Sequence, residues 1–203
     1  MIYDKVNIGE GDIVSIPSPR SYKDCLILIQ SDKYRILGKK CSYAYVIKEL
    51  IFHPLANPLM WLRLCAYRGR LYRLFSLMYR LSSRRFCLDI PHTTKIGYGF
   101  YIGHGICVVI NGATIIGNNV NVSQFNNIGS SNGTFAVIGD DVWLGPSVCV
   151  VDDVHIGSGA SVGAGAVVVK DIPKESTAVG VPAKVVNFNN PRRYIRNKWE
   201  WFN

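Results

Sequence analysis

The sequence predicts a mainly β protein in three parts: a basic α-helical region over residues 1–88, a solenoid of short repeats over residues 89–186 and a tail over residues 187–203. Two observations lead to this prediction. Aliphatic residues recur every six positions in the second half of the chain, and most arginines lie before residue 86 whereas most glycines lie after residue 96. The 203 residues are enough to bury a core, and a hydrophobic content of 48% excludes a disordered chain.

The first half of the chain carries helix start signals. Ser21 and Asp24 have the spacing of a capping box, although Asp stands in place of Glu or Gln, and they open an apolar-periodic stretch that reaches Ile36. Residues 42–52 form the second expected helix, which Pro54 ends.

A third start signal is Asn57 followed by Pro58, a capping side chain before a proline at the first helical position. Apolar residues at roughly helical spacing then continue to Phe86, and Gly69 is expected to interrupt them. Several arginines decorate this stretch: Arg63, Arg68, Arg70, Arg73, Arg80, Arg84 and Arg85.

Residues 1–88 carry the whole net charge of the chain, +9, and this basic region admits several partners. The Arg-rich segment 61–86 could make a peripheral contact with an anionic membrane, or attract an acidic polysaccharide. An ordinary helix packed on the solenoid, with its Arg face in solvent, is the remaining explanation. Nucleic acid is not expected as a partner, because the basic residues follow helical spacing and no binding motif accompanies them.

The second half is a repeat with a period of six. Such a period fits neither a helix nor an ordinary strand, so each unit must hold a short extended segment and a turn. We expect the aliphatic residue to point inward, the glycine that often follows it to permit the turn, and each unit to bury its face only against the next coil. Two extra residues follow Val108 and four follow Ile128. The aliphatic positions are Ile90, Ile96, Ile102, Val108, Ile116, Val122, Ile128, Ile138, Leu144, Val150, Ile156, Val162 and Val168.

This repeated I-G-x-x-x-x pattern resembles the hexapeptide-repeat acyltransferases over residues 89–186. Residues 163–173 and 180–184 look like the closing signature of the members that use CoA. The resemblance implies a left-handed parallel β-helix with three hexads per coil, assembled as a homotrimer or a dimer of trimers, and it implies acetyl-CoA as cosubstrate. The alternative from a different class is a non-catalytic trimeric scaffold.

Within that superfamily the chain looks most like the serine acetyltransferases. Residues 88–97 and 101–105 resemble that family's D-I-H-P-x-x-K-I-G…D-H stretch, so its catalytic Asp and His fall on Asp89 and His104. Histidine suits the general base because its pKa lies near working pH, and a carboxylate on its other ring nitrogen would fix the tautomer. Fifteen residues is close to one coil, so we expect Asp89 to lie nearly beneath His104.

Further residues match family positions that bind the substrates. Ser130 falls where the family supplies a backbone oxyanion donor. CoA is expected in the groove between neighbouring subunits, where lysines would meet its phosphates, and no metal site is expected. Packing on a β-helix face is the alternative for the tryptophan, and solvated corner charges for the lysines. The residues that match cofactor positions are Trp143, Gly145, Ala164, Val169, Lys170 and Lys184.

The sequence departs from the serine acetyltransferases where the acceptor would bind. Gly103 precedes His104 where the family has Asp, and the loop over residues 130–136 holds no basic residue where the family has an Arg-His pair. A pocket for free serine must pair a carboxylate and an ammonium, whereas a sugar hydroxyl needs neither. We therefore expect O-acetylation of a sugar in capsule, O-antigen or exopolysaccharide, with serine O-acetylation for cysteine biosynthesis as the alternative.

The chain shows no signal peptide and no apolar run of 18 residues, so we expect a cytoplasmic protein, with association at the inner face of the membrane left open. Its scattered cysteines are expected to be reduced thiols. The aromatic residues of the tail suggest that it docks on a surface.

Overall fold

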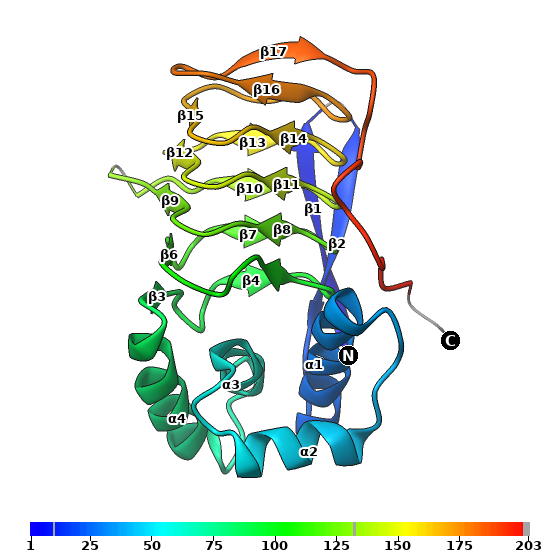
Figure 1. Cartoon of the computed structure of the whole chain (residues 1–203), viewed down its shortest axis with the longest axis vertical. Helices are drawn as coiled ribbons and strands as arrows, with labels where there is room; N and C mark the ends of the chain where they lie inside the picture. The colour runs from blue at the N-terminus through cyan, green and yellow to red at the C-terminus, as the bar shows by residue number, and fades with distance from the viewer. Residues whose placement is uncertain (10, 132, 201–203) are drawn as a thin grey trace.

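The computed structural model describes residues 1–9, 11–131 and 133–200, and Figure 1 shows its arrangement. Short strands stack into a β-helix, helices close one end of the stack, and an N-terminal hairpin and the C-terminal tail run along its sides. The predicted left-handed β-helix and the helices that precede it are confirmed.

The strands of the β-helix are two to four residues long and repeat once on each side of every coil. They are β3 (Leu88–Asp89), β4 (Lys95–Ile96), β5 (Tyr101–Ile102), β6 (Val108–Ile110), β7 (Ile115–Ile116), β8 (Asn121–Val122), β9 (Asn127–Gly129), β10 (Val137–Ile138), β11 (Trp143–Leu144), β12 (Cys149–Val151), β13 (His155–Ile156), β14 (Ser161–Val162), β15 (Val167–Val168), β16 (Thr177–Val179) and β17 (Lys184–Asn187).

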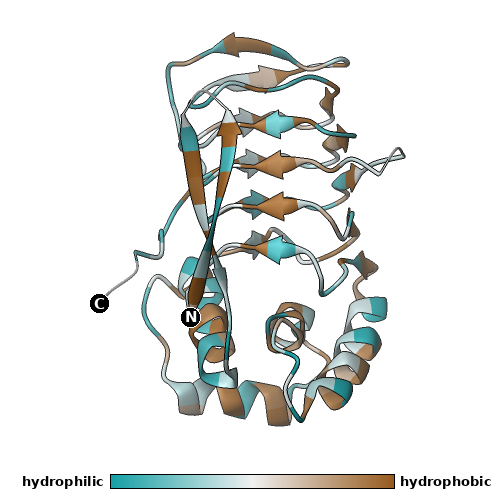
Figure 2. Ribbon diagram, turned by 180° about the vertical axis from the view of Figure 1, so that it is seen from behind, coloured by the Kyte–Doolittle hydropathy of each residue, from teal (hydrophilic) through white to brown (hydrophobic). Residues whose placement is uncertain are grey.

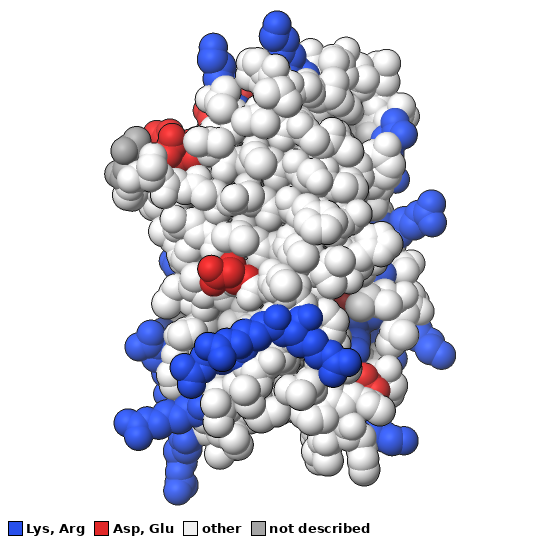
Figure 3. Space-filling model, turned by 60° about the vertical axis from the view of Figure 1, so that its left-hand side comes forward, with Lys and Arg blue, Asp and Glu red and all other residues white. Residues whose placement is uncertain are grey.

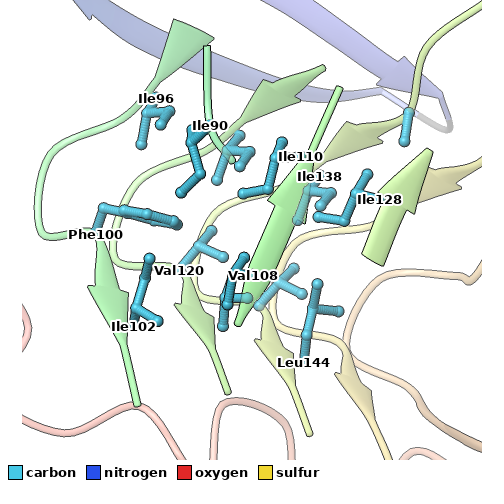
Figure 4. Close-up of a cluster of buried hydrophobic side chains, with 14 of the residues drawn as sticks. Ile90, Ile96, Phe100, Ile102, Val108, Ile110, Val120, Ile128, Ile138 and Leu144 are labelled. Carbon is cyan, nitrogen blue, oxygen red and sulfur yellow. The ribbon is translucent and has the colours of Figure 1, made fainter. Parts of the chain in front are cut away.

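These strands form three sheets with the orders β4-β7-β10-β13, β5-β8-β11-β14-β16-β17 and β3-β6-β9-β12-β15. All neighbours are parallel except β17, which returns antiparallel to β16. The register stacks the aliphatic residues, so that Ile96, Ile116 and Ile138 lie in one column. Figure 4 shows such side chains meeting inside the coils, and they are almost fully buried. The expectation that the aliphatic residues point inward is therefore confirmed.

One detail of the repeat differs from expectation. Asp89 pairs with Val109, and Ile110 pairs with Ile128. The two extra residues therefore lie between Ile102 and Ile110, in the corner after β5, and not after Val108. The period alone could not decide this, because Val108 and Ile110 are both buried and either could continue the column.

A column of glycines allows the coils to approach closely at another corner. A Cβ atom on Gly117 would lie 2.5 Å from the carbonyl carbon of Gly139, a distance that Cβ atoms do not adopt. Gly97 and Gly139 meet the backbone of the next coil at similarly short distances. These glycines are therefore required by the spacing of the coils.

The helices are α1 (Tyr22–Leu37), α2 (Tyr43–Phe52), α3 (Pro58–Cys65) and α4 (Tyr72–Arg85). The expected cap at Ser21 is confirmed, because its hydroxyl accepts a hydrogen bond from the backbone N–H of Asp24, and the Ser42 hydroxyl caps α2 in the same way. Asn57 precedes α3 as expected, with Pro58 at the first helical position, but its side chain makes no capping hydrogen bond. The expected interruption near Gly69 is also confirmed, since α3 ends and α4 begins on either side of it.

A buried ion pair joins two helices to the first coil. Arg63 on α3 donates two hydrogen bonds to the carboxylate of Asp32 on α1, at 2.8 and 2.9 Å. Arg63 also donates to the carbonyl of Ile96 at 2.8 Å, and Asp32 accepts from the N–H of Phe100 at 2.8 Å. The helical region thus satisfies backbone groups that the end of the β-helix would otherwise leave unpaired.

The prediction that residues 1–88 are helical is wrong at the N-terminus. The strands β1 (Ile2–Gly9) and β2 (Asp12–Ser18) form an antiparallel hairpin that lies against the sheet of β4, β7, β10 and β13, as Figure 2 shows from behind. Ile8, Val14 and Ile16 pack there with Val137. Alternating apolar residues on each side of a glycine turn predict such a hairpin.

The tail runs from the last coil back along the stack towards the helices (Figure 1). Trp199 is buried, its ring lies edge-on against Tyr34 of α1, and its backbone N–H donates to the side-chain oxygen of Asn119. The expected docking of the tail is therefore confirmed for Trp199. Trp201 and Phe202 lie outside the described residues.

Candidate active site

His104 lies at the corner between β5 and β6, in the coil nearest the helices. Its side chain is exposed, and its backbone has a φ of +60°. Gly105 follows with a φ of +66°, so two consecutive left-handed residues make the turn. The corner that holds the two extra residues of the repeat is thus the one that presents His104.

A cavity of about 210 Å³ opens beside His104. The helical region forms one wall and the first coil forms the other, and most of the lining is apolar. The polar lining residues include Lys33, Asp32 and Asn57. The Lys33 ammonium also lies 3.6 Å from the Glu49 carboxylate. No spacing in the sequence pointed to these residues of the helical region, because they come from separate elements that only the fold brings together.

Asp89 does not lie beneath His104. Its strand neighbour in the next coil is Val109, five residues beyond His104, and both Asp89 and His104 have exposed side chains. The expectation failed because a regular coil of three hexads spans 18 residues, three more than separate Asp89 from His104, and the two extra residues lengthen this coil to 20. The role of Asp89 as the residue that orients His104 stays a prediction.

The other predicted site residues fall on two edges of the β-helix. Residues two positions beyond the paired Ile102, Val122, Leu144 and Val162 share one corner, so Ala164 lies in line with His104, and Gly145 lies at the same corner, one position earlier in its coil. We call this the His104 edge. Ala164 lies three coils from His104, about 14 Å along the stack. A cofactor that extends along the stack would meet all of these residues.

The second edge lies at the next corner. Ile128 and Val168 both pair with Val150, so Ser130 lies in line with Lys170, which follows Val169. We call this the Ser130 edge. Val169 is 47% exposed and Lys170 is also exposed, and the Ser130 hydroxyl lies 3.1 Å from that of Thr134. Because the sheet of β3, β6, β9, β12 and β15 separates the two edges, one chain does not bring Ser130 to His104.

Two further predicted residues remain: Trp143 is covered by the tail, and Lys184 lies apart from both edges. Trp143 stacks on Tyr194 of the tail, with ring centroids 4.1 Å apart, and its ring reaches over Gly145. The packing alternative for Trp143 therefore describes its contacts within this chain. Lys184 begins β17 at the far end of the stack and is exposed.

A buried arginine joins α1 to the β-helix, outside the residues that line the cavity. Arg35 on α1 is buried and donates to the carbonyl of Gly99 and to Asn121, and burial lowers its pKa to about 10. Within residues 1–9, 11–131 and 133–200, no three His, Cys, Asp or Glu side chains gather as a metal ion would need.

Comparisons with known proteins agree on the fold. The family model "Bacterial transferase hexapeptide (six repeats)" matches residues 135–170. The serine acetyltransferase of Bacillus pumilus is 35% identical over 130 residues, which cover 62% of this chain and 60% of that protein. The serine acetyltransferase of Synechococcus elongatus is 30% identical over 168 residues, which cover 80% and 66%. The chain thus spans less than two thirds of these relatives.

Solved structures give the same result. The serine acetyltransferase of Neisseria gonorrhoeae superposes with a TM-score of 0.64 at 29% identity, covering 81% of this chain and 66% of that chain. The soybean serine acetyltransferase apoenzyme gives a TM-score of 0.62 at 27% identity, covering 78% and 67%.

Proposed function

Because this chain belongs to the hexapeptide-repeat acyltransferase superfamily and is similar to serine acetyltransferases, we propose that it transfers the acetyl group of acetyl-CoA to a hydroxyl group. One observation carries the assignment of the site. His104 is exposed at a corner, opens onto a cavity between the helices and the first coil, and lies on the same edge as Gly145 and Ala164. A base, a space for the acceptor and a path for the cofactor thus meet there.

The proposed chemistry uses His104 as the general base. His104 removes the proton of the acceptor hydroxyl as the oxygen attacks the thioester carbonyl. A backbone N–H beside the Ser130 position of a neighbouring chain would stabilise the oxyanion of the tetrahedral intermediate. As the intermediate collapses, the carbon–sulfur bond breaks and the imidazolium of His104 returns the proton to the CoA thiolate. The products are the acetyl ester and free CoA.

We propose that the catalytic unit contains more than one chain, and a homotrimer would place equivalent edges side by side. The His104 edge and the Ser130 edge lie at different corners of one chain. A neighbouring chain that packs its Ser130 edge against the His104 edge would complete the groove and bring Val169 and Lys170 to the cofactor. Measurement of the native mass tests this proposal, and an active monomer would refute it.

For the acceptor, the comparisons favour L-serine, the alternative of our sequence prediction, over a sugar. The relatives and neighbours reported above are serine acetyltransferases, and a further Neisseria gonorrhoeae structure at 28% identity is a complex with serine. Lys33 lines the cavity and brings a cation close to where the carboxylate of serine would lie, although its ammonium also pairs with Glu49 at 3.6 Å. We therefore propose serine as the first candidate.

A sugar hydroxyl remains the second candidate because of one observation. Among the described residues that line the cavity, the acidic one is Asp32, and its carboxylate is already engaged by Arg63 and the N–H of Phe100. The ammonium of serine therefore finds no free carboxylate in the cavity of a single chain. An uncharged sugar needs none.

The experiment is an assay of thiol release from acetyl-CoA with two kinds of acceptor. L-Serine at millimolar concentration is compared with fragments of capsular polysaccharide or exopolysaccharide, and His104→Ala is the control. Saturable turnover on serine that His104→Ala abolishes supports the first candidate, and turnover on glycans alone supports the second. Failure to bind CoA or release thiol with any acceptor would indicate the scaffold alternative.

A further inference from the structure

Helix α4 has a second apolar face that the fold leaves uncovered. Its core face packs Phe75 and Tyr79 against the rest of the molecule. On the opposite side, Leu74, Leu77 and Leu81 are between 43% and 52% exposed. These leucines are three and four residues apart, so they form one stripe along the helix.

Arginines border this leucine stripe. At 100° per residue, Arg73, Arg80 and Arg84 lie together on one side of the stripe and Arg85 lies on the other, and all are exposed. We call Leu74, Leu77, Leu81, Arg73, Arg80 and Arg84 the α4 face. Residues 66–86 contain six arginines and no acidic residue. A helix that merely faces solvent commonly alternates charges of both signs, which this one does not.

The neighbouring helix α2 adds apolar surface at the same end of the molecule. Ile51 and Phe52 are 64% and 66% exposed, and Val46 is the residue of this helix that the fold buries. Figure 1 places α2 and α4 at the end opposite β17, and Figure 3 shows Lys and Arg side chains gathered over this end. No described helix is long and apolar enough to cross a bilayer.

We propose that the α4 face docks on an anionic membrane surface, with its leucines in the interface and its arginines at the lipid phosphates. Arginine pairs with phosphate, and each cation close to an anionic surface strengthens binding several-fold. The leucines beside these cations add apolar surface area, and its burial in the lipid interface strengthens binding. The segment predicted at the outset, 61–86, is thereby corrected: residues 61–65 are buried in α3, and the docking surface begins after them.

Charge distinguishes this partner from the other occupants of such a face. A second copy that packed α4 against α4 would bring an equally basic helix to the α4 face, and like charges would repel. Nucleic acid would meet the arginines but would leave the leucine stripe against a polar partner. An anionic lipid surface satisfies both kinds of residue.

The test is flotation of the full-length protein with vesicles of phosphatidylcholine alone or mixed with phosphatidylglycerol, at low and high salt. We expect binding to the anionic vesicles that weakens with salt. The variant Arg73→Gln/Arg80→Gln/Arg84→Gln should bind roughly 100-fold more weakly, about a factor of five per arginine. The variant Leu74→Gln/Leu77→Gln/Leu81→Gln, which keeps the charge, should also lose binding.

The matched control Lys5→Gln/Lys39→Gln/Lys174→Gln removes three exposed cations that lie outside α2 and α4, and it should bind like the parent. Melting temperature and thiol release from acetyl-CoA confirm that each variant is folded, and they report on the proposed function independently of docking. Equal binding to neutral vesicles, or no binding to anionic ones, would overturn the proposal. The proposal would also be overturned if the parent bound a DNA duplex and the leucine variant bound it equally well. A native mass of the parent that is twice that of the leucine variant would overturn it too.

Discussion

Arg63 holds Asp32 in a two-point hydrogen bond inside the molecule, and each of them also binds the backbone of the first coil. Their side chains are 6% and 10% exposed. The pair therefore fixes α1, α3 and the end of the β-helix relative to one another. The cavity beside His104 lies between these elements, so its shape depends on this contact.

Replacement of Arg63 by alanine should destabilise the protein by about 3–5 kcal/mol, because Asp32 would be left buried without its partner. The measurement is the free energy of unfolding in urea. Lys95→Gln is the matched control, since it breaks an exposed pair with Asp4 and should cost at most about 1 kcal/mol. Equal losses in the two variants would contradict the structural role of Arg63.

Gly117→Ala should disrupt the β-helix, because the new Cβ would meet backbone of the next coil at 2.5 Å. Gly129→Ala is the comparison, since its Cβ would find only an Asn127 oxygen at 3.4 Å. We expect a large fall in melting temperature for the first variant and a small change for the second. Thermal unfolding followed by circular dichroism distinguishes them.

His104→Ala should lower kcat by roughly 10²–10⁴ with little effect on CoA affinity, because a general base acts in the transition state. Asp89→Asn should have a smaller effect if Asp89 acts only by orienting the ring. The measurements are steady-state kinetics and CoA binding on variants whose oligomeric state is unchanged. Full activity of His104→Ala would remove His104 from the mechanism.

A mixture of two inactive chains should recover activity if each site uses both edges. His104→Ala disables the His104 edge and Lys170→Glu opposes the cofactor phosphates on the Ser130 edge. When the two variants are unfolded together and refolded, some interfaces combine an intact His104 edge with an intact Ser130 edge. Activity above that of either variant alone supports the shared groove, and none despite mixed assembly contradicts it.

Mild oxidation should join Cys87 to Cys107. These residues precede Leu88 and Val108, which pair on adjacent coils, so their Cα atoms are one strand spacing apart, within the range that a disulfide spans. Partial burial and the neighbouring Cys87 thiol raise the pKa of Cys107, so the thiolate forms at higher pH and cross-linking should accelerate as the pH rises. Mass spectrometry of peptides identifies the bond, and Cys149 is the internal control.

The β-helix was predictable because its signal is repeated many times. Each coil contributes an aliphatic residue to the same column, so one ambiguous position changes little. The register around His104 was not predictable, because Val108 and Ile110 are both aliphatic and both buried. Three-dimensional packing decides which of these two residues continues the column, and the period of the sequence carries no information about it.

The two edges of the site show the same limit. The residues of the His104 edge and the Ser130 edge were predicted by resemblance to a family, and a resemblance gives only their positions along the sequence. Their separation on the surface follows from which corner each occupies, and that requires the register. The cavity wall was also missed, because Lys33 and Asn57 come from segments whose own patterns predict only helices. Likewise, the N-terminal hairpin was missed although its alternating residues were visible.

The tail changes how this solenoid should come apart. A stack of coils held only by nearest neighbours frays from its open end, one coil after another. Here the chain leaves the last coil, passes back along the stack and is held near the first coil, where Arg35 binds the carbonyl of Arg196 and Asn119 binds Trp199. The last coil therefore cannot loosen without straining the contact beside α1. The two ends of the stack are coupled, and the molecule should melt in one cooperative step.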